Sequence, residues 1–172
     1  MHEYDFVFNS GDWMHVGDFF DIKVKLRLNL TDYSTYTDPV PLFVNHECGE
    51  HVGSVLSTRL SGRKLVGRVG VTDGLELGRE TIHKLNNGML RSCSVGVYSD
   101  ESLCEEYGSL DEQIENKSLH LDMYNIELYE LSLTPLPADR RARLFSVGDR
   151  RVGSSHSNSG MRYVRGILTK RG

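Results

Sequence analysis

The chain has 172 residues, which fits a single domain with a sizeable core. Its 38% hydrophobic and 26% charged content is ordinary for a globular protein, and the formal net charge of −4 argues against nucleic acid as a general partner. No apolar run is long enough for a membrane span, and the start shows no secretion signal. We therefore expect an intracellular protein, not a secreted one, whose cysteines (Cys48, Cys93 and Cys104) are reduced thiols.

Strand patterns dominate the first half of the chain. Residues 22–30 alternate apolar side chains with basic and polar ones, which is typical of an antiparallel strand with one buried face. Residues 41–46 form a short apolar run that ends in His46, and two more strands are predicted over 52–60 and 64–72. A histidine at the end of a buried strand, beside a loop, is well placed to face a cleft, although such histidines more often have a structural role.

A zinc site is an alternative interpretation of the same region. His46, Cys48 and His51 could bind the metal, because imidazole and thiolate are its usual ligands. Zinc sites usually contain two ligand pairs, and Cys93 and Cys104 do not form a second pair with a recognisable spacing. A small zinc-binding module is therefore kept as a hypothesis that metal analysis would test.

Two helices are predicted between the strands. Asp73 and Glu76 have the spacing of a capping box, and Gly88 ends the helix that follows them. A later acidic stretch over 99–118 is expected to be loop-like and to include a short helix near 110–116.

The strand predicted over 90–97 has an unusual composition. Alternation places Ser92, Ser94 and Gly96 on one face, with no side chain at Gly96 to crowd the hydroxyls. Such a face indicates either a close crossing of another backbone or a nucleophile. The serine needs chemical partners elsewhere in the chain before it carries a functional meaning.

A second polar residue lies in an apolar setting in the strand predicted over 119–134. Alternation places Glu130 on the same face as Ile126 and Leu128. A carboxylate there requires a partner such as histidine or arginine. Together, Ser94, His46 and Glu130 are the residue types of a nucleophile, a base and an orienting acid. The chain has no Gly-x-Ser-x-Gly elbow, however, and the order His, Ser, acid along the sequence differs from that of the common serine hydrolases.

Three blocks resemble one known family, the prohead (capsid maturation) serine proteases of tailed phages, which are distant relatives of the herpesvirus assemblins. The first block is the apolar run 42–46 ending in histidine, followed by Val-Gly at 52–53. The second comprises 74–80 and 87–97, in which a serine precedes an apolar residue and glycine. The third is Tyr-Glu-Leu-Ser-Leu-Thr-Pro-Leu-Pro-Ala at 129–138.

The resemblance implies a role for each polar residue of these blocks. His46 corresponds to the general base and Ser94 to the nucleophile. Glu130 is our choice for the third member, with Asp122 and His120 as the alternatives, because assemblins use a second histidine and the phage enzymes an acid.

Two further assignments follow from the same resemblance. Ser92 ranks second to Ser94 as the nucleophile, because it lacks the following apolar-Gly pair. Arg140 and Arg141 are similar in placement to the consecutive arginines from which assemblins build part of their oxyanion hole.

The resemblance also implies a fold and a function. The fold is expected to be mostly β (α+β), a curved antiparallel β-barrel of the assemblin type with a few helices, over residues 1–147, followed by a flexible Gly/Ser/Arg-rich tail over 148–172. The function is expected to be a serine endopeptidase that needs no cofactor and cleaves the major capsid and scaffold proteins inside the procapsid, in the host cytoplasm, with self-processing. The resemblance is compatible with a homodimer and implies neither a nucleic-acid nor a membrane partner. A catalytically inactive structural homologue is the other alternative.

Overall fold

The computed structural model describes residues 1–147, 150–151, 161–164 and 167–170. The described part of the chain is mostly β, and its two α-helices are short. The main sheet has the strand order β11-β10-β1-β7-β6-β5-β9-β3-β2, with β4 and β8 also paired to β9. Its strands are β1 His2–Asn9, β2 Met14–Phe19, β3 Ile22–Leu28, β4 Ser34–Thr35, β5 Pro41–Val44, β6 Gly53–Ser61, β7 Lys64–Val71, β8 Cys93–Leu103, β9 Ser118–Leu133, β10 Leu144–Val147 and β11 Arg150–Arg151.

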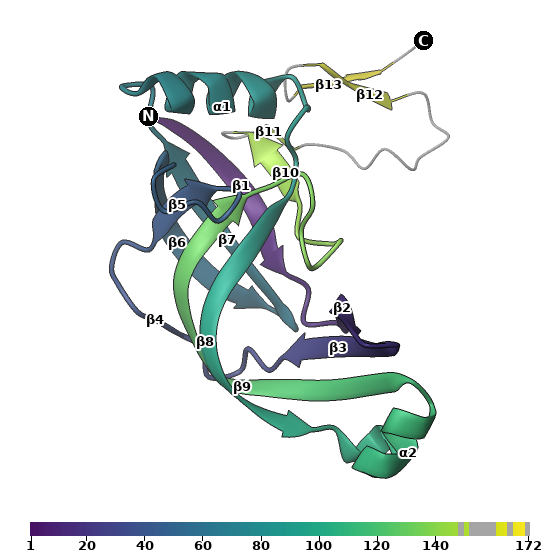
Figure 1. Ribbon diagram of the computed structural model, residues 1–172. Coiled ribbons are helices and arrows are strands. Elements are labelled where there is room, and N and C mark those ends of the chain that lie inside the picture. Colours follow the sequence, from purple (N-terminus) through teal and green to yellow (C-terminus); the bar gives the residue numbers. More distant parts are fainter. Residues whose placement is uncertain (148–149, 152–160, 165–166, 171–172) are drawn as a thin grey trace.

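Strand β9 organises this sheet. It is 16 residues long and pairs in parallel with β3, β4 and β5 at successive positions. Strand β8 pairs with it antiparallel, and Figure 1 shows the two as long, curved neighbouring ribbons. The mostly-β class is therefore confirmed, whereas the closed antiparallel barrel is not, because the sheet is open and mixed. Parallel neighbours require long crossover connections, which local sequence patterns do not reveal.

The hydrophobic core is formed mainly by side chains of the strands, and helix α1 (Glu76–Asn86) contributes Ile82 and Leu85. Three alternating aromatic residues of β1, Tyr4, Phe6 and Phe8, are almost completely buried, and Leu85 of α1 is fully buried with them. Burial raises the pKa of Tyr4 to about 12, and its hydroxyl donates to Oδ1 of Asn86 at 3.2 Å. Burial of these apolar side chains stabilises the sheet, and the sheet in turn positions the polar residues described below.

The two helices begin in different ways. Helix α2 (Leu110–Glu115) has a full capping box formed by Ser109 and Glu112, which confirms the short helix predicted there. The capping box predicted at Asp73 is wrong: α1 begins at Glu76 without a side-chain cap. Asp73 instead lies 3.6 Å from the amino group of Met1, because the start of β1 is brought next to this turn.

The predicted tail, 148–172, lies partly outside the described residues. Within it, β11 pairs with β10, and β12 (Met161–Val164) pairs with β13 (Ile167–Lys170) in a separate two-stranded sheet. The positions 148–149, 152–160, 165–166 and 171–172 are not described, so the boundary of the tail stays a prediction. In the part of the chain that the structure describes, no helix is long and apolar enough to cross a membrane.

Candidate active site

His46 lies in a tight turn directly after β5. Its backbone φ is 62° and that of Asn45 is 54°, both in the left-handed region that few non-glycine residues adopt. Two hydrogen bonds hold the turn against β9: the Asn45 N–H donates to the Leu133 carbonyl at 3.0 Å, and the His46 N–H donates to Ser132 Oγ at 3.0 Å. The backbone conformation therefore determines where the imidazole projects.

The imidazole of His46 meets Glu130. Nδ1 of the ring is within hydrogen-bond distance of Oε1 of Glu130, and the Ser132 hydroxyl donates to Oε2 of the same carboxylate at 3.4 Å. The Glu130 side chain is only 4% exposed, whereas that of His46 is 43% exposed. The buried carboxylate thus has two partners, and it holds the Nδ1 side of a ring that is itself partly exposed.

Ser94 and Gly96 lie on β8, opposite this part of β9. The register aligns Ser94 with Ser132 and Gly96 with Glu130. A Cβ at position 96 would lie 2.3 Å from Cγ and 2.6 Å from Oε1 of Glu130, far closer than atoms can approach. Glycine at 96 is therefore required for the carboxylate to occupy its place. The three nearest atoms to such a Cβ belong to the side chains of Glu130 and Tyr129, so the close approach at Gly96 is not the crossing of another backbone that was one interpretation of this strand face.

One pocket of about 320 Å³ is lined by Ser94, His46 and Glu130 together. The rest of its wall comes mainly from apolar side chains of β1, β2, β3, β8 and β9. The structure thus brings the three predicted residues together from three separate strands or strand ends. A serine, an imidazole and a buried carboxylate at one pocket are the groups that nucleophilic acyl transfer uses.

The alternative residues lie elsewhere. Asp122 accepts from Arg27 Nε at 2.7 Å, and this hydrogen bond lowers the pKa of the carboxyl group. His120 is buried, its ring stacks on Tyr107, and burial lowers its pKa. Ser92 precedes β8, and its carbonyl accepts from the backbone N–H of Thr134 at 3.1 Å. Asp122, His120 and Ser92 are absent from the described residues that line the pocket.

A family model for caudovirus prohead serine proteases matches residues 1–152. The chain belongs to this family. The match extends over the complete N-terminal part of the chain as well as the three blocks that carry the resemblance. No curated protein and no solved structure is significantly similar to the chain.

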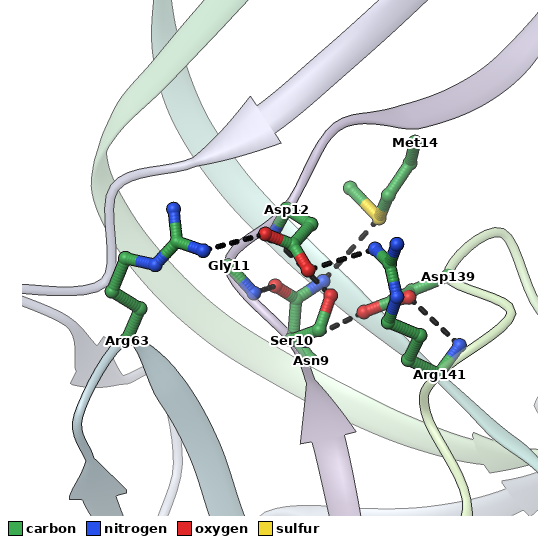
Figure 2. Close-up of polar contacts among 8 residues, drawn as sticks. All are labelled: Asn9, Ser10, Gly11, Asp12, Met14, Arg63, Asp139 and Arg141. Carbon is green, nitrogen blue, oxygen red and sulfur yellow. Dashed lines mark hydrogen bonds and ion pairs between the residues drawn. The ribbon is translucent and has the colours of Figure 1, made fainter.

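Arg140 and Arg141, which the resemblance implies as oxyanion donors, line a second pocket next to that of Ser94, together with Asp139. Among the described residues that line the Ser94 pocket itself, neither arginine is present. The backbone N–H of Arg141 donates to Oδ1 of Asp139 at 2.9 Å, and its guanidinium donates to Asp12 at 2.7 Å (Figure 2). Arg140 is exposed and accepts from Arg143 Nε through its carbonyl. The Arg141 side chain therefore links the loop after β9 to Asp12, in the loop after β1.

Asp139 is a residue of this loop that sequence reasoning missed. It is 5% exposed, and its Oδ2 accepts from the Ser10 backbone N–H at 2.5 Å, at the end of β1 (Figure 2). The carboxylate therefore joins the loop after β9 to the loop after β1, and it also forms part of the wall of the Ser94 pocket. The hydrogen bond between its side chain and the backbone N–H of Arg141 forms an Asx turn, which is a local pattern that the sequence could have indicated. The contact with Ser10 could not have been predicted, because Ser10 is far away in the sequence.

The zinc interpretation gains no support from the geometry. The ring of His46 is engaged with Glu130, and the ring of His51 packs against Phe43 with centroids 5.7 Å apart. Cys48 is exposed. Within the described ranges, no three His, Cys, Asp or Glu side chains are grouped so that they could hold a metal ion.

Proposed function

We propose that the chain is an active serine endopeptidase that cleaves scaffold and capsid proteins inside the phage procapsid during head maturation. The observation that supports this most is the pocket shared by Ser94, His46 and Glu130, in which a buried carboxylate holds the imidazole. Membership of the prohead serine protease family supports the proposed substrate class and place of action.

In this mechanism, Ser94 Oγ attacks the scissile carbonyl carbon while Nε2 of His46 takes the hydroxyl proton. The tetrahedral intermediate collapses as the imidazolium gives that proton to the leaving amine, and an acyl-enzyme remains. A water molecule then attacks the ester, again with His46 as the base, and releases the carboxylic acid and the free serine. Glu130 keeps Nδ1 protonated and stabilises the imidazolium throughout.

The oxyanion donors are the part of the proposal that rests on the family resemblance alone. Arg140 and Arg141 keep this proposed role, and they line the second pocket, next to that of Ser94, with Asp139 in the wall of both. The Arg141 backbone N–H donates to Asp139 and its guanidinium donates to Asp12. Asp139 positions the loop that carries both arginines through Ser10.

Co-expression with the capsid and scaffold proteins of the same phage tests the proposed function. Intact mass spectrometry should detect cleaved capsid protein with the wild type and with Ser92→Ala, and only full-length capsid protein with Ser94→Ala. Cleavage by Ser94→Ala would show that Ser94 is not the nucleophile. An inactive wild type would favour the structural homologue.

Self-processing is the second part of the proposal. The tail over 148–172 is rich in Gly, Ser and Arg, a composition that buries little apolar area and suits a protease-accessible segment. The intact mass of the wild type should fall with time, and that of Ser94→Ala should stay constant. A wild type that remains full length while it cleaves capsid protein would contradict self-processing alone.

A further inference from the structure

The pocket that contains Ser94 is lined by several polar residues and by a larger apolar body. The polar residues include Ser94, His46 and Glu130, together with Asn9, Ser99 and Asp139. The body is formed by side chains from five strands: Phe8, Met14, Leu26, Leu28, Val97 and Met123. An apolar cavity beside a nucleophile is suited to hold part of the substrate, because apolar walls give affinity and a few polar groups fix the orientation.

The charges in the pocket select against a charged side chain. Glu130 and Asp139 are the two carboxylates among its described lining residues. Glu130 already binds His46 and Ser132, and Asp139 accepts from two backbone N–H groups. A lysine or arginine would lose its hydration without gaining a free carboxylate, and an acidic side chain would face two like charges.

The size and the wall of the pocket favour a single large side chain. Its volume of about 320 Å³ is at the lower end of the range for ligand pockets. Met14 and Met123 contribute flexible thioethers that adapt to different apolar shapes. The sulfur of Met14 also accepts from Nδ2 of Asn9 at 3.3 Å, which holds the Met14 side of the wall in place.

We propose that this pocket is the main specificity subsite, and that it binds one large uncharged apolar side chain, of the leucine, methionine or phenylalanine type, adjacent to the scissile bond of the substrate. This inference rests on the proposed protease function. It identifies the apolar body of the pocket, and Met14 and Met123 in particular, as the part of the chain that selects the cleavage site.

The first test is digestion of a proteome-derived peptide library by the wild type, with Ser94→Ala as the control. Peptides cut in a Ser94-dependent manner should show leucine, methionine or phenylalanine enriched at one position within two residues of the cut, with lysine, arginine, aspartate and glutamate depleted there. Enrichment of a charged residue, or no enrichment, would overturn the inference while leaving the protease assignment intact.

The second test measures binding without cleavage. The chain contains five methionines, so methyl-labelled methionine gives a simple NMR spectrum. N-acetyl-leucine methylamide should shift the Met14 and Met123 signals but not that of Met89, which is 69% exposed outside the pocket, and N-acetyl-lysine methylamide should shift none of the three. Equal shifts with both probes, or none with the leucine probe, would overturn the inference. The expected shifts together with an uncut library would support the subsite and refute the protease function.

A size variant completes the test. Met123→Phe reduces the space in the pocket and should shift the ratio of kcat/KM for leucine over phenylalanine substrates by about tenfold towards the smaller side chain. The matched control is Met89→Phe, which adds the same atoms at an exposed position and should leave the ratio unchanged. An identical ratio in both variants would show that Met123 does not face the substrate.

Discussion

Strand β9 carries a carboxylate near each of its ends. At its start, Asp122 is paired with Arg27 at 2.7 Å. The nearby His120 is stacked on Tyr107, with ring centroids 3.8 Å apart, and Trp13 packs edge-on against the same ring. Asp122 and His120 are thus each paired with or packed against a basic or an aromatic neighbour.

At the other end of β9, Glu130 has the opposite surroundings. Its partner is the imidazole of His46, which is 43% exposed and lines a pocket that also contains Ser94. Both ends therefore bring a histidine and an acid near each other, but at this end alone is the histidine paired with the acid and open to a pocket. The comparison shows that the neighbours of a titratable pair, rather than the residue types, decide whether it can do chemistry.

The largest expected effect comes from removing the nucleophile or the base. Ser94→Ala and His46→Ala should each lower kcat by about 10⁵–10⁶, and the double variant should be little worse, because such residues act as a unit. Single-turnover cleavage of a capsid-derived peptide measures these rates. If the losses in kcat of the two single variants instead multiplied in the double variant, Ser94 and His46 would act independently, which would contradict the prediction.

A matched pair of substitutions on β9 sharpens the comparison of its two ends. Glu130→Gln should lower kcat by about 10²–10⁴, less than the loss of the base, because the carboxylate orients and stabilises the imidazolium without moving a proton itself. Asp122→Asn, the equivalent change at the other end, should leave kcat/KM within about twofold of the wild type. Similar losses from both substitutions would mean that the two ends are not functionally distinct.

Gly96 tests whether the close approach of β8 and Glu130 matters. Gly96→Ala places a methyl group where Glu130 lies, so the carboxylate must move away from His46. We expect a loss of about 10-fold or more in kcat and of about 1–3 kcal/mol in the free energy of unfolding. Gly49→Ala is the control, since nothing lies within 4 Å of a Cβ built there. Full activity of Gly96→Ala would show that the contact with Glu130 is dispensable.

The smallest expected effect concerns pH and the enclosed histidine. Burial lowers the pKa of His120, so its neutral form is favoured in the folded state. The unfolded chain binds the proton first, and folding stability due to this residue is therefore lost as the pH falls below the unfolded value of about 6.5. The His120→Phe variant keeps an aromatic ring at this position but has no group that titrates in this range. Its free energy of unfolding, measured with urea, should therefore fall less between pH 7 and pH 5 than that of the wild type. An equal loss in both proteins would contradict a buried, neutral His120.

The sequence singled out residues that line one pocket, but it did not predict what surrounds them. Alternation in a mostly apolar strand singled out Ser94 and Glu130, because a buried polar group stands out locally. The capping box at Asp73 failed because α1 begins only at Glu76, with Leu75 at the N-cap position, and the Asp73 carboxylate lies beside the amino group of Met1, which precedes β1 and is distant in the sequence. The parallel neighbours of β9 and the contact between Asp139 and Ser10 could not be predicted, because each joins segments that are far apart in the chain.

The two ends of β9 support different parts of the Ser94 pocket. The turn of His46 is hydrogen-bonded to Ser132, and Ser94 is aligned with the same residue, so both proposed catalytic residues are positioned by the last few residues of the strand. The apolar wall contributed by β2 and β3 is attached to the start of the strand, where Leu28 is aligned with Met123. On the proposed function and subsite, substitutions in that wall would change which peptide is selected without altering the contacts of His46 and Glu130. The proposed protease and its cleavage sites could then diverge together during evolution without a change in the proposed catalytic geometry.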